Sequence, residues 1–102
     1  MGKILVFIFD EMTDYEITFI THLLGADAGK EIITIAYDDK VIKGRSGFLY
    51  KPLRLVRDVL DENVEGLILC GGLYGDTREE LIQLINKLNL EGKLLADRKS
   101  TR

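Results

Sequence analysis

The sequence predicts an α/β fold, namely a partial doubly wound sheet of mostly parallel strands with flanking helices and a small β-hairpin. Two observations support this class. Short apolar runs, typical of strands buried on both faces, alternate with segments whose apolar residues recur at helical spacing. These alternating segments also supply the crossover connections that parallel strands require. The 102 residues contain no internal repeat and no linker, so we expect one small core.

Four strands are expected, at residues 4–9, 32–37, 67–70 and 93–96. Right-handed crossovers place the first strand between the second and the third, with the fourth strand beyond the third. The carboxyl ends of the first and third strands then meet at one edge of the sheet. Ligands of open α/β sheets bind at such an edge, so the sequence places the candidate site there.

Two helices are expected between these strands. Thr13 and Glu16 form a capping box, and Gly25 and Gly29 bracket the end of the helix that follows. A second capping box at residues 77–80 opens a helix with five apolar residues expected to face inward: Leu81, Ile82, Leu84, Ile85 and Leu88.

The segment between the second and third strands is expected to hold the hairpin. Residues 41–42 and 48–50 flank a Gly-Arg-Ser-Gly turn, which is typical of two short antiparallel strands. Pro52 bars the following stretch from a central strand, and residues 55–60 have the spacing of a helical turn. Arg45, Arg54 and Arg57 are expected to be solvated loop charges.

Composition excludes several classes of function. The net charge of −3 gives no basic surface typical of nucleic-acid binding, and no apolar run reaches the ~20 residues of a membrane span. One cysteine excludes an intramolecular disulfide and a cysteine zinc cluster. We read no signal peptide and expect a cytoplasmic protein without a metal or cofactor. His22, the only histidine, is expected to be solvated or to serve packing.

The third predicted strand ends in the most informative motif of the chain. Cys70 is followed by Gly71 and Gly72, whose backbone N–H groups no side chain covers, so a ligand can approach closely. Two interpretations of Cys70 stay open. It is either a reactive thiol beside these N–H groups or a small hydrophobic residue on a buried strand.

Four spaced motifs resemble the DJ-1/PfpI family, which has the class I glutamine amidotransferase-like fold with a flavodoxin-like architecture. They are Lys3-Ile4-Leu5-Val6-Phe7, Asp14-Tyr15-Glu16-Ile17, Leu67-Ile68-Leu69-Cys70-Gly71-Gly72 and Glu91-Gly92-Lys93-Leu94-Leu95-Ala96. On this resemblance, residues 1–96 are the amino-terminal part of a DJ-1/PfpI-like domain, and residues 97–102 are a polar tail outside the family pattern.

The resemblance implies a catalytic site. Glu16 matches the family glutamate that hydrogen-bonds a reactive cysteine, and Gly71 and Gly72 match the glycine pair of the oxyanion hole. The cysteine should follow Ala96 on a strand-to-helix elbow. In this sequence Lys99 occupies the position of that cysteine in the family pattern. The resemblance therefore implies a chain truncated before the nucleophile elbow and catalytically incompetent. Its parent role would be that of a cysteine-dependent hydrolase, a deglycase or a stress-response protein. Glu16 also has a purely structural interpretation as half of the capping box.

Three functions remain open. The first is the truncated DJ-1/PfpI-like protein, whose family would act on a small-molecule substrate. The second is a non-enzymatic, self-associating module, most simply a homodimer, which pairs through an open sheet edge at residues 94–96. Too few helices follow residue 67 to cover the apolar residues expected there: Leu67, Ile68, Leu69, Leu94 and Leu95. The third is a small independent enzyme that uses Cys70, as a thiol enzyme or redox sensor, or that uses Ser100, although no general base is evident for either residue.

Overall fold

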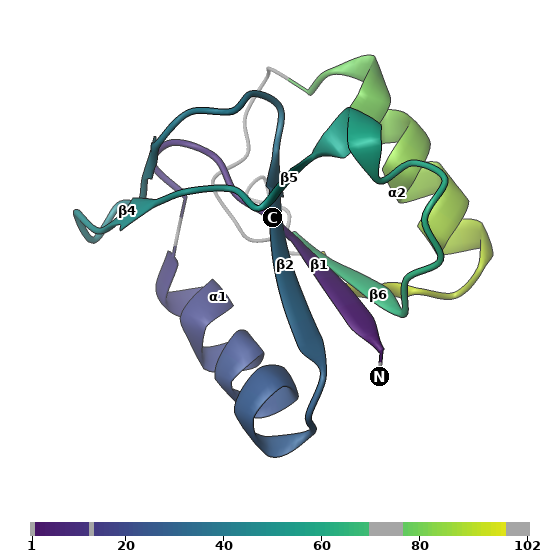
Figure 1. The fold of residues 1–102 in the computed structure, drawn as a ribbon, viewed down its shortest axis with the longest axis horizontal. Coiled ribbons are helices and arrows are strands. Elements are labelled where there is room, and N and C mark those ends of the chain that lie inside the picture. Colours follow the sequence, from purple (N-terminus) through teal and green to yellow (C-terminus); the bar gives the residue numbers. More distant parts are fainter. Residues whose placement is uncertain (1, 13, 70–76, 98–102) are drawn as a thin grey trace.

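The computed structural model describes residues 2–12, 14–69 and 77–97. Within them, a parallel sheet has the strand order β5-β2-β1-β6-β7 (Figure 1). The strands are β1 (Lys3–Phe7), β2 (Glu31–Ala36), β5 (Arg54–Leu55), β6 (Gly66–Leu69) and β7 (Leu94–Asp97). The predicted order of the four main strands is confirmed. The short strand β5, which follows Pro52 and pairs with the outer edge of β2, was not predicted.

Strand boundaries differ from the prediction by one or two residues. β1 ends at Phe7, although the N–H of Ile8 still donates to the carbonyl of Ile35 at 2.9 Å. β7 begins at Leu94 rather than residue 93 and includes Asp97, the first residue of the predicted polar tail. Apolar pattern alone does not mark the last backbone hydrogen bond of a strand, which is what fixes these ends.

The first helix runs as α1 (Asp14–Thr21) and continues as the π-helical segment η1 (His22–Asp27). It ends between Gly25 and Gly29, as predicted. Gly29 has a φ of +72°, a conformation that favours glycine. A Cβ on Gly25 would lie 3.1 Å from Cγ1 of Ile32, so this glycine lets the helix approach β2 closely. Thr13, the predicted cap, lies outside the described residues.

The second helix, α2 (Glu79–Leu90), corrects two predictions. Arg78 is the N-cap instead of Thr77, and no side-chain capping hydrogen bond forms, so the predicted capping box is wrong. Leu81, Leu84 and Leu88 are fully buried, whereas Ile82 is 39% exposed. The buried stripe follows a spacing of three and four residues, and Ile82 lies just outside it.

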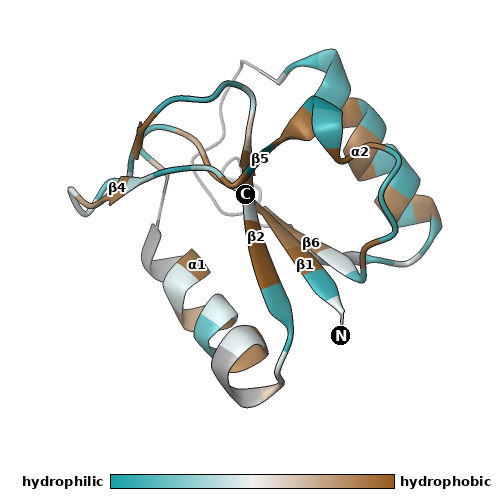
Figure 2. Cartoon of the chain, viewed as in Figure 1, coloured by the Kyte–Doolittle hydropathy of each residue, from teal (hydrophilic) through white to brown (hydrophobic). Residues whose placement is uncertain are grey.

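The sheet separates two apolar cores, and its central strands are coloured mostly hydrophobic (Figure 2). α2 and the 3-10 turn η2 (Val56–Asp58) cover one face, and α1 covers the other. The buried residues of the first core are Leu5, Phe7, Ile33, Ile35, Val56, Val59, Val64, Leu67, Leu69, Leu81, Leu84 and Leu88. Those of the second core are Ile4, Val6, Ile8, Met12, Ile17, Ala36, Ile42 and Ile68. Helices on both faces confirm the doubly wound class.

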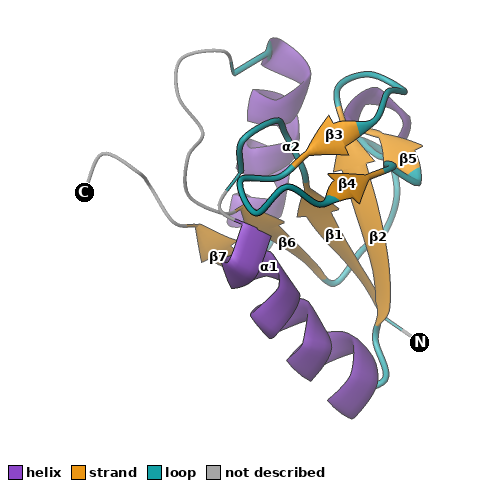
Figure 3. Ribbon diagram, turned by 90° about the vertical axis from the view of Figure 1, so that its left-hand side faces the viewer, coloured by secondary structure: helices purple, strands orange, loops and turns teal. Residues whose placement is uncertain are grey.

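The predicted hairpin is present as the antiparallel pair β3 (Ile42–Lys43) and β4 (Leu49–Tyr50). Ile42 is buried in the second core, and Tyr50 packs against it. The hairpin therefore lies on the same side of the sheet as α1 (Figure 3).

One sequence-based expectation about the sheet is wrong. Leu67, Ile68 and Leu69 were expected to be bare because few helices follow them, but each is at most 5% exposed. Leu67 and Leu69 pack under α2, and Ile68 packs in the core shared with Met12 and the hairpin. Residues that precede β6 in the sequence complete its covering. Counting only the helices that follow β6 therefore underestimates its burial.

A polar clamp joins the start of α2 to the end of β2. The backbone N–H of Arg78 donates to the Tyr37 hydroxyl at 2.9 Å, and its guanidinium donates to both carboxylate oxygens of Asp38 at 3.2 and 3.3 Å. The guanidinium also lies 4.5 Å from the centre of the Tyr37 ring, whose edge packs on Phe7. The hydrogen bond from Arg78 lowers the pKa of Asp38 below its ordinary value.

Truncating Leu84 to alanine should destabilise the fold by about 2–5 kcal/mol, because it leaves a cavity between α2 and the sheet. Ile82→Ala on the same helix is the matched control and should cost less than about 1 kcal/mol, since Ile82 is partly exposed. Urea denaturation measures both free energies of unfolding. Equal costs for the two variants would contradict the orientation of α2.

The clamp predicts that the pKa of Asp38 lies below 3.8 and moves back towards it in Arg78→Gln. Because the folded-state pKa is lowered, the ion pair stabilises the fold above the ordinary pKa, and this contribution is lost as the pH falls through the folded-state pKa. Arg78→Gln should thus be slightly less stable than the parent at neutral pH, and the difference should shrink in acid, where only the contact of the guanidinium with the Tyr37 ring still favours the parent.

Carboxyl NMR titration with parallel urea denaturation measures both effects. Arg57→Gln is the control, because Arg57 acts on Asp38 only through a weaker Coulombic attraction. An unchanged Asp38 titration in Arg78→Gln would contradict the clamp.

Candidate functional site

The candidate site is the edge of the sheet where the parallel strands end. Phe7 pairs with Ile35 of β2 and with Leu69 of β6, and Leu69 pairs in turn with Asp97 of β7. The carboxyl ends of these four strands therefore lie side by side. The connections from β1 to α1 and from β6 to α2 both leave from this edge, as the sequence predicts.

Of the predicted site residues, the structure describes only the backbone of Glu16. Glu16 lies in the first turn of α1, which the chain enters directly from the carboxyl end of β1. Cys70, Gly71 and Gly72 lie outside the described residues, as does Lys99. Cys70 directly follows Leu69, the last residue of β6, so the chain enters this segment at the same edge as the start of α1.

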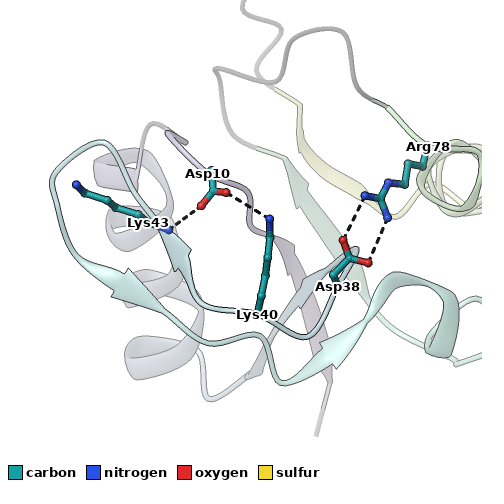
Figure 4. Close-up of polar contacts among 5 residues, drawn as sticks. All are labelled: Asp10, Asp38, Lys40, Lys43 and Arg78. Carbon is teal, nitrogen blue, oxygen red and sulfur yellow. Dashed lines mark hydrogen bonds and ion pairs between the residues drawn. The ribbon is translucent and has the colours of Figure 1, made fainter.

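Two backbone–backbone hydrogen bonds and one backbone–carboxylate hydrogen bond join the hairpin to the β1–α1 loop. The Lys43 N–H donates to Asp10 Oδ1 at 3.0 Å (Figure 4). The Glu11 N–H donates to the Lys43 carbonyl at 2.7 Å, and the Arg45 N–H donates to the Met12 carbonyl at 3.0 Å. Glu11 has a φ of +65°, which costs a residue other than glycine roughly 1–3 kcal/mol. The hairpin holds this strained loop, and the loop sets where α1 begins.

Charged side chains of both signs surround the edge. Lys40 Nζ lies 3.7 Å from Asp10 Oδ2, and the Arg78 guanidinium contacts Asp38 (Figure 4). Water reaches these side chains, so their ion pairs contribute little to stability. Asp38 is a poor general base because Arg78 lowers the pKa of its carboxyl group.

The described residues offer no nucleophile with an activating base at this edge. His22 is the only histidine of the chain and lies exposed in η1, beyond the end of α1 remote from the edge. Within the described ranges, no group of three or more His, Cys, Asp and Glu residues could hold a metal ion. No helix in this part of the chain is both long and apolar enough to cross a bilayer.

Sequence reasoning missed the clamp formed by Tyr37, Asp38 and Arg78. The available signal was the position of Tyr37 and Asp38 directly after a strand, at the end where sites form. Their partner is 40 residues away, so only the three-dimensional arrangement identifies it. Arg54, expected to be a solvated loop charge, lies in β5 and pairs with Glu62 at 2.9 Å.

Comparison with known proteins identifies the same architecture. The model of the DJ-1/PfpI family matches residues 2–97. A search of curated proteins found no significant match. Oxidized DJ-1 of Toxoplasma gondii superimposes with a TM-score of 0.79 and 22% identity, over 94% of this chain and 54% of that chain.

Two further solved structures agree. DJ-1beta of Drosophila melanogaster gives a TM-score of 0.81 at 16% identity, over 98% of this chain and 56% of its own. The putative protease I of Bacteroides thetaiotaomicron gives 0.72 at 17% identity, over 94% of this chain and 62% of its own. At these identities the likeness shows the fold, and the chain spans about half the length of these relatives. Since the family model covers nearly the whole sequence, the chain belongs to the DJ-1/PfpI family.

Proposed function

We propose that this chain is a DJ-1/PfpI-type protein that does not turn over substrate as it stands. The observation that carries the proposal is Lys99, which stands in the column where the family pattern has its nucleophilic cysteine.

The chemistry of the residues present supports the absence of turnover. A lysine ammonium is protonated at neutral pH and is a poor nucleophile unless it is desolvated or placed beside another cation. Glu16, in its family role, hydrogen-bonds a cysteine that this sequence does not provide after Ala96. The family carboxylate would therefore have no thiol to position or deprotonate.

The parent activity would be that of a cysteine-dependent hydrolase or deglycase acting on a small molecule, or a stress-response role. In that activity Glu16 would position the thiol, and the N–H groups of Gly71 and Gly72 would stabilise an oxyanion. The start of α1 and the end of β6 at one edge support this assignment, since both segments must approach the same reacting atom.

A thiol enzyme built on Cys70 is the weaker candidate. Such an enzyme needs a general base, and the one histidine of the chain lies in η1, beyond the end of α1 that is remote from the carboxyl edge. The cytoplasmic location stays a prediction, which rests on the single cysteine of the sequence.

The purified chain should show no turnover in glutamine-amide hydrolysis, peptide hydrolysis or deglycation assays. Cys70→Ser is the control, and it should be indistinguishable from the parent chain. Turnover that persists in homogeneous Cys70→Ser protein would reveal another nucleophile and contradict the proposal. Turnover that Cys70→Ser abolishes would instead establish the thiol enzyme.

A further inference from the structure

Glu11, in the loop between β1 and α1, has a backbone conformation that is unfavourable for its residue type. Its φ of +65° lies in the left-handed region, which a residue with a Cβ atom disfavours. Of the described residues other than glycine, Glu11 alone has a positive φ. Strained residues of this kind persist only where their surroundings hold them, and they cluster at binding and catalytic sites.

The surroundings hold the backbone of Glu11 without using its side chain. The Glu11 N–H donates to the Lys43 carbonyl at 2.7 Å, and the hairpin bonds of Asp10 and Met12 flank it on either side. A glycine at position 11 would allow the same three hydrogen bonds with less strain. The backbone geometry of the loop therefore does not explain why this residue is a glutamate.

The Glu11 side chain also has no structural partner in the described part of the chain. It is exposed, and its carboxylate forms no hydrogen bond or ion pair with a described residue. The three other acidic residues in the loops directly after β1 and β2 each pair with a cation: Asp10 with Lys40, Asp38 with Arg78 and Asp39 with Lys51. Among the described residues of these two loops, Glu11 thus carries the one uncompensated carboxylate.

Glu11 lies at the edge of the sheet where the candidate site is expected. It follows the carboxyl end of β1 and precedes α1, whose first turn contains Glu16. Lys43, whose backbone bonds to this loop, directs its side chain away from Asp10 (Figure 4), and its ammonium group pairs with no described carboxylate. The negative charge of Glu11 is therefore open to a ligand that approaches this edge.

The chemistry of a carboxylate defines the ligand group that fits. An ionised carboxylate only accepts hydrogen bonds, and its bonds from a cationic donor are stronger than those from a neutral one. The neighbouring carboxylate of the same loop, Asp10, already binds the primary ammonium of Lys40, with Oδ2 and Nζ 3.7 Å apart. The matching group is therefore a primary ammonium, which occurs on small amines and on the lysine side chains of peptides.

We propose that Glu11 is a specificity-determining residue of the candidate site and binds the primary ammonium group of a ligand at the carboxyl edge of the sheet. Such binding needs no nucleophile, so the inference is independent of the proposed lack of turnover. Equilibrium titration measures ammonium binding and the assays above measure turnover, so the failure of one proposal is distinguishable from the failure of the other.

Amide NMR titration of the chain with n-butylammonium chloride tests the proposal. The amides of Glu11 and Met12 should shift saturably in the parent chain. Glu11→Gln keeps the strained backbone but removes the charge, so it should weaken binding by about tenfold, the loss expected for a charge-assisted hydrogen bond. Asp39→Asn is the matched control: it removes the same charge from the neighbouring loop, where Asp39 already pairs with Lys51, and it should bind like the parent.

Glu11→Gly separates strain from binding. It should raise the urea midpoint of unfolding, because glycine adopts this φ without strain, and it should also lose the ammonium ligand. Titration with N-acetyllysine methylamide distinguishes a peptide lysine from a small amine, since tighter binding of one of the two probes identifies the source of the ammonium.

Equal binding by the parent chain and Glu11→Gln would overturn the proposal, because the carboxylate would then not be the recognised group. Equal shifts with the neutral analogue n-butanol would overturn it too, since they would show apolar contact only. So would a Glu11→Gly chain that is less stable than the parent, because the glutamate would then have a structural role. Absence of saturable shifts with both ammonium probes would likewise contradict it.

Discussion

Burial of β1 on both faces is the constraint on which the rest of the structure depends. Leu5 and Phe7 point into one core, and Ile4, Val6 and Ile8 point into the other. Burying each such side chain contributes about 1.5–3 kcal/mol, but only if both faces of the strand are covered. The chain meets this requirement with α2 and η2 on one side and with α1 and the hairpin on the other.

This two-sided burial also positions the candidate site. A strand that is apolar on both faces can present polar groups only at its ends, so the functional groups collect where the parallel strands stop. Two contacts over long sequence separations fix that edge. The clamp of Tyr37, Asp38 and Arg78 anchors α2 to β2, and the hairpin holds the loop that contains Glu11.

The order of the main strands could be predicted from the sequence, because the spacing of apolar residues and the length of apolar runs depend directly on burial. Sequence-based prediction failed where a single contact decides at which of two neighbouring residues a helix begins. Thr77 has a capping hydroxyl, yet the helix begins at Glu79, and the Tyr37 hydroxyl accepts the hydrogen bond of the Arg78 N–H. The burial of Ile68 depends on Met12 and the hairpin, which precede the strand and which a count of the later helices cannot reveal.

The candidate site was predictable to a different extent. Strand topology identified the edge, and the family resemblance assigned Glu16, Gly71 and Gly72 to it. The backbone of Glu16 lies in the first turn of α1, and its family role stays a prediction. The exposure of Phe48 and Leu49 was not predictable, because it follows from the way the hairpin packs on the core.

Amide hydrogen exchange tests the central role of β1 most directly. The amides of Leu5, Val6 and Phe7 lie between β2 and β6, so they should exchange only through global unfolding and be among the slowest in the chain. Amides of the short outer strand β5 and of the hairpin should exchange faster through local opening. Exchange of the β1 amides at the rate of β5 would contradict the account, because the central strand could then open without unfolding either core.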